Sequence, residues 1–415
     1  MHRVVITGLG AITPIGKSVK DYWSNLLKGK SGVNKITRFD AQKFKTHFAA
    51  EIKQYDPLDY FDRKETRKLD RYSQYGLIAA NEAIKDAKLD FSKLDTTKTG
   101  VIFSSGIGGF ETFEQEVTDY TNNKMQPRFN PFFITKIIAN GLSGLISINN
   151  GLRGINYCPV TACASSTQSI IHAFNYIRLG KADIIISGGA EAPITETAIG
   201  GFNAMKAMST NNENYASASK PFDKNRDGFV IGEGAGALII ESLESALKRG
   251  APIYAEIAGG GESSDAYHIS GTHPEGLGAY LAMQNSLNEA NIAPQKIDYI
   301  NAHATSTGLG DISEIKAIEK LFQSKLDHVQ ISASKSMTGH LLGATGAIEV
   351  ISTCLSVKHN LIPPTINTTE IDERIPQNLK LSLGQQTSKK VDYALSNSFG
   401  FGGHCAALLL KKYNF

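Results

Sequence analysis

One cysteine in the chain has the surroundings of a nucleophile. Cys163 is flanked by small alanine and serine residues, and an amphipathic helix is expected over 165–179, directly after it. The positive end of a helix dipole favours a thiolate and lowers the thiol pKa, and the thiolate is the reactive form. The position therefore predicts a nucleophile, although a buried and inert cysteine is the common alternative.

Two histidines have positions suited to acid–base or oxyanion chemistry. His303 follows a predicted strand at 299–302, and the carboxyl ends of strands are where α/β proteins place functional groups. His340 lies in a glycine-containing turn before a predicted helix at 341–358, where the dipole disfavours the imidazolium. Each is equally compatible with a packed, structural histidine. One cysteine with two histidines fits nucleophilic catalysis without fixing the reaction, since a protease would use Asn or Asp as the third group.

A run of alternating phenylalanine and glycine, 399–403, follows a predicted strand at 394–396. Glycines make the backbone mobile, and Phe399 and Phe401 would act as apolar plugs. Such a loop can gate an apolar tunnel and offer backbone N–H groups to an oxyanion. A plain glycine-rich turn is the alternative.

Short apolar runs rich in β-branched residues alternate with helical patterns along the whole chain. Continuous apolar strands are typical of sheets covered on both faces, so the pattern predicts an α/β fold. A weak internal repeat is visible, because each half has a small-residue turn that opens a helix, then a strand, then a closing strand after a glycine turn. The predicted strands are 4–7, 99–104, 183–187, 236–241, 253–258, 299–302, 330–333, 394–396 and 406–411, and the predicted helices include 165–179, 278–290, 312–322 and 341–358.

The composition excludes several classes of protein. A net charge of +3 over 415 residues argues against a broad basic face for nucleic acid. No apolar run reaches the roughly 18 residues of a membrane span, and the N-terminus lacks a secretory pattern. The four cysteines form no CxxC pair, which argues against a zinc ribbon or a thioredoxin site. So few and irregularly spaced cysteines favour a reducing compartment, and we expect a cytoplasmic protein.

The segment from Asp223 to Gly228 looks like the start of a calcium-binding EF-hand loop. Its twelfth position is Gly234 where the motif needs Glu, and strand-like residues follow instead of a helix. We therefore predict a sharp turn, fixed by its acidic residues and glycine, rather than a metal site.

The sequence resembles the thiolase-like condensing enzymes, and among them the elongating β-ketoacyl-[acyl carrier protein] synthase II family. The resemblance implies a thiolase-like α/β fold whose duplicated halves form a five-layered α-β-α-β-α core. Residues 1–250 would carry the nucleophilic cysteine and residues 251–415 the two histidines. The matching motifs occur in family order: Val4-Val5-Ile6-Thr7-Gly8-Leu9-Gly10, Gly106-Ile107-Gly108-Gly109, Thr161-Ala162-Cys163, Gly188-Gly189-Ala190-Glu191, Pro221-Phe222-Asp223, Arg226-Asp227-Gly228-Phe229, Asn301-Ala302-His303, Lys335-Ser336-Met337-Thr338-Gly339-His340 and Asn397-Ser398-Phe399-Gly400-Phe401-Gly402-Gly403.

The resemblance also implies a reaction, the decarboxylative Claisen condensation of fatty-acid elongation. An acyl group would pass from acyl carrier protein to Cys163, and malonyl carrier protein would then lose carbon dioxide. The resulting carbanion would attack the thioester and give a 3-oxoacyl chain longer by one C₂ unit. Backbone N–H groups of Cys163 and Phe401 would hold the tetrahedral oxyanion, while His303 and His340 would hold the enolate.

Further roles follow from the resemblance alone. It implies a homodimer that uses acyl carrier protein, with no redox cofactor and no catalytic metal. Cations facing the acidic carrier would speed the encounter. The implied residues are Lys335 and Glu349 behind the histidines, Thr305 and Thr307 for the pantetheine arm, Ile107, Phe202 and Phe399 for the acyl pocket, and Arg67, Lys68, Arg128 and Lys206 for the carrier surface.

The chain departs from the family pattern at three places, and these leave the acyl-length preference open. Ala304 replaces a usual Gly, Gly308 stands where Pro is common, and His404-Cys405 replaces Thr-Asn. Three other functions compete with fatty-acid elongation. A polyketide or aryl-polyene ketosynthase would share the catalytic residues and differ in pocket shape. A non-catalytic chain-length subunit would lack the nucleophile. A degradative thiolase would need a second cysteine, for which only Cys405 is near, and the histidine pair favours decarboxylation over this.

Overall fold

The computed structural model describes residues 1–323 and 325–414, and its centre is one mixed sheet of eleven strands. Its two middle strands, β1 (Val4–Ile12) and β8 (Ala255–Ser264), pair antiparallel. The sheet then continues outward with two antiparallel pairings followed by two parallel ones on both sides, and one side adds a third parallel pairing, between β10 and the edge strand β12. One side is β7 (Gly234–Ser242), β6 (Ile184–Glu191), β4 (Thr99–Ser104) and β5 (Asn156–Tyr157), and the other is β15 (His404–Lys411), β14 (Tyr393–Gly400), β9 (Tyr299–Asn301), β10 (Gln330–Ser332) and the edge strand β12 (Lys380–Leu381).

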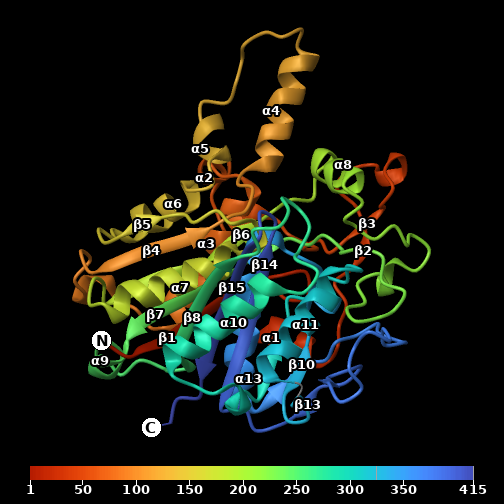
Figure 1. Cartoon of the computed structure of the whole chain (residues 1–415). Helices are drawn as coiled ribbons and strands as arrows, with labels where there is room; N and C mark the ends of the chain where they lie inside the picture. The colour runs from red at the N-terminus through yellow and green to blue at the C-terminus, as the bar shows by residue number, and fades with distance from the viewer. Residues whose placement is uncertain (324, 415) are drawn as a thin grey trace.

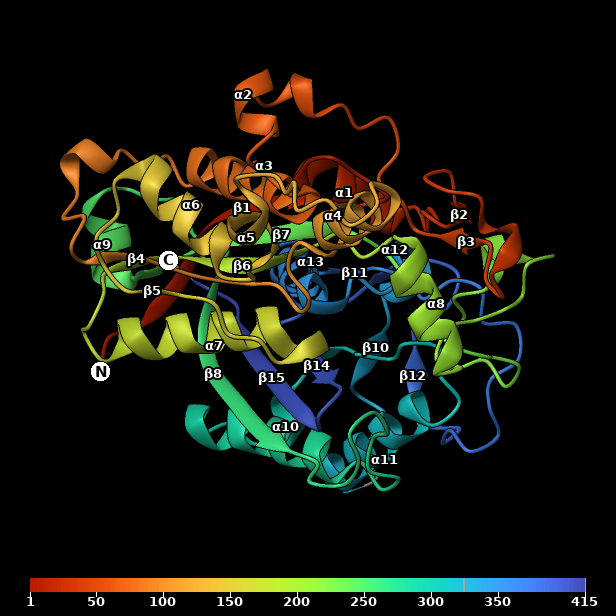
Figure 2. The ribbon, with the colours of Figure 1, turned by 90° about the horizontal axis from the view of Figure 1, so that it is seen from above.

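This matched order gives the duplicated fold that was predicted, and Figure 2 shows its five layers. Helix α3 (Arg71–Asp86) covers the outer face of one half of the sheet, and α10 (Leu277–Ala290) with α11 (Gly310–Phe322) covers that of the other. Helices α7 (Ser165–Arg178) and α13 (Thr345–His359) form the middle layer. Because the strands are covered on both faces, they are rich in apolar residues, and β6 and β7 are buried over their whole length.

All nine predicted strands are present, but glycine-rich stretches extend several of them. β1 runs to Ile12 and β14 to Gly400, past the apolar residues that made them recognisable. Glycine is a poor strand former in isolation. Here it occurs within strands because neighbouring backbone packs too closely to leave room for a side chain. One helix prediction is wrong at its start, because α13 begins at Thr345 and not at 341. The 3-10 turn η7 (Leu342–Ala344) occupies the intervening residues.

A hairpin of α4 (Phe110–Asn122) and α5 (Phe133–Ile137) stands out from the body of the molecule (Figure 1). Within the described ranges, no helix combines the length and the apolar character needed to cross a bilayer. The remaining elements are α1 (Val19–Leu27), β2 (Asn34–Lys35), β3 (Phe48–Ala49), α2 (Arg63–Thr66), α6 (Gly141–Asn150), α8 (Glu196–Ala204), α9 (Leu243–Lys248), α12 (Lys335–Thr338), β11 (Leu361–Ile362) and β13 (Thr387–Ser388).

Candidate active site

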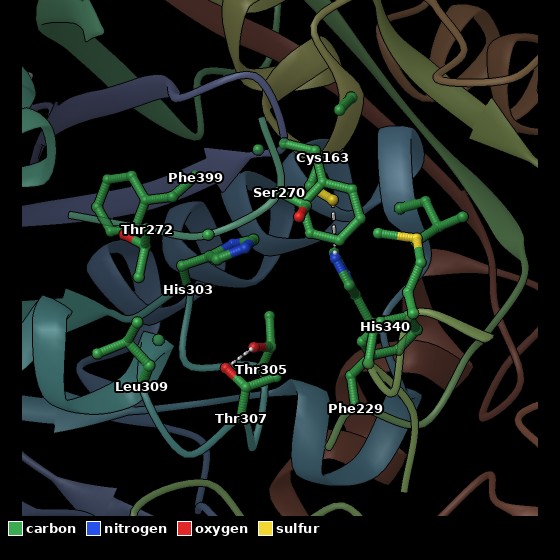
Figure 3. Close-up of a pocket in the computed structure, with 18 of the residues that line it drawn as sticks. Cys163, Phe229, Ser270, Thr272, His303, Thr305, Thr307, Leu309, His340 and Phe399 are labelled. Carbon is green, nitrogen blue, oxygen red and sulfur yellow. Dashed lines mark hydrogen bonds between the residues drawn. The ribbon is translucent and has the colours of Figure 1, made fainter. Parts of the chain in front are cut away.

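The three residues singled out for chemistry face one cavity of about 400 Å³ (Figure 3). Cys163 comes from the first half of the chain, and His303 and His340 come from two separate segments of the second half. The sulfur of Cys163 lies 3.0 Å from Nε2 of His340. The ring of His303 stands almost perpendicular to that of His340, with centroids 5.4 Å apart.

Cys163 lies in a 3-10 turn, η4 (Ala162–Ala164), and α7 begins only at Ser165. The Ser165 hydroxyl accepts from the amide of Thr161 at 2.8 Å and donates to the carbonyl of Ala162 at 2.6 Å, which holds the turn in shape. Cys163 therefore lies in the turn before α7 and not in the first turn of the helix, where a thiol would be activated by the helix dipole.

The expectation of a lowered thiol pKa is wrong. Burial raises the pKa of Cys163 to about 12, and the carboxylate of Glu191 adds to the rise. The charge of Lys335 and the backbone N–H groups of Phe401 and Cys163 lower the pKa but do not offset burial. Burial removes more stabilisation from a thiolate, through lost hydration, than a nearby helix N-terminus provides. The resting sulfur is thus a thiol beside an imidazole, and its activation requires transfer of its proton.

His340 is held on both sides of its ring. Nδ1 lies 3.0 Å from the hydroxyl of Thr345, the first residue of α13, and Phe229 packs edge-on against the ring at 5.4 Å. Its backbone N–H donates to the carbonyl of Val230 at 2.7 Å. Burial, assisted by the charge of Lys335, holds the pKa of His340 well below its usual range, so the ring is neutral. The neutral form agrees with the prediction, but burial rather than a helix start is its cause.

His303 is positioned through its backbone. Both carboxylate oxygens of Glu314 are used, one accepting from the amide of His303 at 2.9 Å and the other from that of Ala304 at 2.8 Å. The side-chain amide of Asn397 donates to the same carboxylate at 2.9 Å, so the strand β14 fixes Glu314 in turn. Burial lowers the pKa of His303 well below its usual range, and the charge of Lys335 lowers it further.

Lys335 and Glu349 form a buried ion pair behind the histidines. Nζ of Lys335 lies 2.7 Å from Oε1 of Glu349, and the side chains are 1% and 0% exposed. Neither residue lines the cavity. Burial raises the pKa of Glu349 to about 7 while Lys335 opposes the rise. Within this pair, Lys335 is the member whose positive charge lowers the pKa of Cys163, His303 and His340, which favours a thiolate and neutral imidazoles in the cavity.

The loop of residues 400–403, here called the gate loop, lies against the turn of Cys163. A Cβ atom on Gly400 would come within 2.9 Å of the amide nitrogen of Cys163, so only glycine fits there. The amide of Gly402 donates to the carbonyl of Ile269 at 2.7 Å, and the amide of Asp265 donates to Gly403 at 2.8 Å. The gate loop is therefore tied to residues 265–272, which also border the cavity.

The structure brings most of the other predicted residues to the cavity. Ile107, Phe202, Thr305, Thr307, Phe399, Phe401 and Lys206 all line it. Arg67, Lys68 and Arg128 are exposed and lie outside its lining, with Lys68 over the ring of Phe132 at 5.8 Å. Cys405 is buried and is not among the lining residues, which leaves the thiolase alternative without its second cysteine in this cavity.

Sequence reasoning missed several residues of the site. Phe229, Glu191 and Asn397 were in the motifs quoted for the family resemblance but had no role assigned to them. Glu314 and Thr345 gave no signal, since each looks like an ordinary polar residue on a helix. The roles of Glu314 and Thr345 follow from contacts with segments that are brought together only in the folded protein.

Comparison with known proteins identifies the family and the fold. The family model described as β-ketoacyl synthase, N-terminal domain, matches residues 1–246, and the corresponding C-terminal domain matches residues 254–369. A solved ketosynthase from Burkholderia phymatum covers 100% of both chains at a TM-score of 0.92 and 32% identity. A ketosynthase of a type II polyketide system, solved with its acyl carrier protein and bound to the hexaketide, covers 100% of both chains at a TM-score of 0.92 and 33% identity. The chain therefore belongs to the β-ketoacyl synthase family and has its thiolase-like fold.

Within that family, full-length relatives are more specific. The curated 3-oxoacyl-[acyl-carrier-protein] synthase 2 of Staphylococcus aureus is 48% identical over 99% of this chain and 98% of its own length. The protein of the same name from Synechocystis sp. is 45% identical over 99% of this chain and 98% of its own length.

Proposed function

We propose that this protein is the elongating 3-oxoacyl-[acyl carrier protein] synthase of fatty-acid synthesis, equivalent to the synthase 2 enzymes that it resembles. The observation that carries the proposal is the 3.0 Å contact between Cys163 and His340 in a cavity that also holds His303. A nucleophile with two neutral imidazoles suits acyl transfer followed by decarboxylation.

Acylation begins with the thiol of Cys163 and the neutral ring of His340. Nε2 accepts the thiol proton as sulfur attacks the carrier thioester, and it returns that proton to the departing pantetheine thiol. The developing oxyanion is held by the backbone N–H groups of Cys163 and Phe401, which already lie near the sulfur. Thr345 can donate to Nδ1 or accept from it, because a hydroxyl does both. The ring can thus change tautomer between the steps.

Condensation uses both histidines as hydrogen-bond donors. The thioester carbonyl of the malonyl group is placed between His303 and His340, and loss of carbon dioxide leaves an enolate on that oxygen. Each neutral Nε2–H then stabilises the charge, and the positive charge of Lys335 supports it from behind. The enolate carbon attacks the acyl group on Cys163, the tetrahedral intermediate collapses and expels the Cys163 thiolate, and the thiolate takes up one proton from solvent, which balances the loss of carbon dioxide.

The comparisons favour fatty-acid over polyketide chemistry. Identity is 45–48% to synthase 2 enzymes and 33% to the polyketide ketosynthase solved with its carrier protein. The presence of Cys163 argues against a non-catalytic chain-length subunit. The cavity wall of Ile107 and Phe202 belongs to an apolar cluster with Met208 and Ile199, which suits an alkyl chain.

We further infer a carrier-docking face and a homodimer. Lys206 stands exposed at the cavity, while Arg67, Lys68 and Arg128 are exposed beyond it, and such cations would attract the acidic carrier protein. The homodimer is supported by the edge strand β5 and by an apolar side chain left exposed on the neighbouring helix α6, Ile148 at 76%. A cytoplasmic location and a division into halves at about residue 250 complete the proposal, supported by the four unpaired thiols and the matched halves of the sheet.

Intact-mass analysis tests the proposed function directly. The purified protein is incubated with acyl carrier protein thioesters of increasing chain length, and then with malonyl carrier protein. We expect a covalent acyl adduct that Cys163→Ala abolishes, followed by release of a 3-oxoacyl chain extended by one C₂ unit. Acylation by polyketide-type but not straight-chain groups would favour the polyketide alternative, and no acylation at all would overturn the role of Cys163.

A further inference from the structure

The loop that presents Thr305 and Thr307 to the cavity is held in an unusual backbone conformation. Their hydroxyls lie 3.0 Å apart on the cavity wall (Figure 3). Between them Ser306 has a φ of 70°, in the left-handed region that a serine rarely adopts. Such a conformation costs energy and persists only where surrounding groups impose it.

Three bonds fix Ser306 in that conformation. Its amide donates to Oδ1 of Asp311 at 3.1 Å, and its carbonyl accepts from the amide of Gly228 at 3.1 Å. Its hydroxyl accepts from the amide of Lys220 at 3.1 Å. Two of these partners belong to the segment 220–229, which contains the Asp223–Gly228 stretch that imitates the start of a calcium loop. This segment is therefore a scaffold for the cavity wall.

Arg226, in the middle of that scaffold, holds the next two residues of the loop. Its Nε donates to the carbonyl of Thr307 at 2.9 Å, and its Nη2 donates to the carbonyl of Gly308 at 2.7 Å. Its Nη1 donates to Asp372 at 2.8 Å. The side chain is 1% exposed, and Asp311 lies 3.4 Å from Nε, so buried acids neutralise the guanidinium on both sides.

We propose that Arg226 is a positioning residue for the phosphopantetheine arm of the carrier protein, acting through Thr305 and Thr307. By fixing two consecutive carbonyls, the planar guanidinium turns both threonine hydroxyls into the cavity, where an amide-containing arm can use them. The inference rests on the proposed function, since it assumes a carrier-borne substrate. Lysine cannot replace the arginine, because one ammonium cannot reach two carbonyls and a carboxylate in this fork geometry.

The test compares Arg226→Lys with wild type on two acyl donors. One donor is acyl carrier protein, and the other is a thiophenyl ester of the same acyl group, which acylates Cys163 without a pantetheine arm. We expect the KM for acyl carrier protein to rise about tenfold, with little change in the acylation rate by the thiophenyl ester. Arg374→Lys is the matched control, because Arg374 also pairs with Asp372 but is 56% exposed and donates to that carboxylate rather than to the loop carbonyls.

A double-mutant cycle with Thr307→Val shows whether Arg226 acts through the threonine. If it does, the valine substitution raises KM in the wild type and adds little in the Arg226→Lys background. An unchanged KM for Arg226→Lys would overturn the inference. Equal slowing with both donors, accompanied by a lower melting temperature, would also overturn it, because that pattern marks general destabilisation. Wild-type protein that reacts with the thiophenyl ester but never with the carrier thioester would instead overturn the proposed function.

Discussion

The turn that carries Cys163 and the turn that follows His340 are built alike. Each is a 3-10 turn that runs directly into a buried helix, η4 into α7 and η7 into α13. The first residue of each has a positive φ, 50° at Ala162 and 47° at Leu342. In this alignment the position of Cys163 in the first half corresponds to Gly343 in the second.

The two turns differ in what faces them. The turn of the second half meets Glu191 at the end of β6, and the amide of Gly343 donates to Oε2 of that carboxylate at 3.0 Å. The turn of the first half meets Gly400 at the end of β14, which has no side chain. The same backbone therefore forms an anion-binding site twice, and each of these two sites is here called a corner. The protein's own carboxylate fills one corner, and the other is left open for the substrate's oxygen.

Filling the open corner should have the largest effect. A Cβ atom in Gly400→Ala would lie 2.7 Å from the carbonyl of Thr161 and 2.9 Å from the amide of Cys163, where the oxyanion must sit. We expect acylation to slow by about 10²–10³-fold, the usual loss of an oxyanion donor. Rapid-quench mass analysis measures the rate. Gly201→Ala is the control, since its Cβ would meet no atom within 4 Å. An unimpaired Gly400→Ala enzyme would contradict the assignment of the open corner.

The open corner does not make Cys163 a thiolate, and pH dependence can show this. Burial raises the pKa of the thiol to about 12, so the thiolate fraction grows with pH throughout the working range. Alkylation by iodoacetamide should speed up about tenfold per pH unit, or about a hundredfold from pH 7 to 9. Peptide mapping assigns the adduct to Cys163. A rate that levels off near pH 8 would show instead that the following helix activates the thiol.

Emptying the filled corner should weaken the fold. Four donors converge on the Glu191 carboxylate, and an amide in Glu191→Gln offers one oxygen and turns an NH₂ group toward donors. We expect a loss of about 2 kcal/mol in the free energy of unfolding, measured with urea. Glu244→Gln, at an exposed carboxylate, should change little. Equal stability of the two variants would show that Glu191 does not hold its corner. The four donors are the hydroxyl of Ser105 and the amides of Gly106, Ile107 and Gly343.

The two turns also differ in the hydrogen bonds made by the first residue of the helix that follows each of them, Ser165 in α7 and Thr345 in α13. Ser165 bonds its own turn, whereas Thr345 bonds the ring of His340 at Nδ1. Thr345→Val keeps the shape but removes the hydroxyl that supports both ring tautomers, so acylation should fall by about tenfold or less. Thr345→Ser should restore most of the rate. If serine and valine behave alike in acylation assays, packing rather than the hydroxyl is what the site requires.

Much of the candidate site could be predicted because its members stand at recognisable places in the chain. His303 follows an apolar strand, and Cys163 precedes an amphipathic helix among small residues. The glycines of the gate loop were interpreted as a source of backbone mobility, and the structure adds another reason for one of them, since Gly400 packs closely on the amide of Cys163. Where the reasoning failed, as with the pKa of Cys163, it counted a local helix dipole and had no measure of burial.

Glu314 and Arg226 could not be predicted because their importance comes entirely from distant partners. Glu314 lies on α11 and bonds the backbone of the His303 loop, and Arg226 reaches carbonyls some 80 residues away in sequence. A charged residue on a helix or in a turn is usually solvated, and only burial with several bonds makes it a positioning group.

By itself, the sequence determined nine strands of the central sheet, most of the bounds of the four predicted helices, and Cys163, His303 and His340 as candidates for chemistry, because apolar periodicity and glycine placement are local properties of the chain. Tertiary structure alone decided which anion corner stays open, whether the thiol is charged, and which buried groups orient the histidines and the threonine loop. Those outcomes depend on desolvation and on hydrogen bonds between segments that meet only when the two halves pack around α7 and α13.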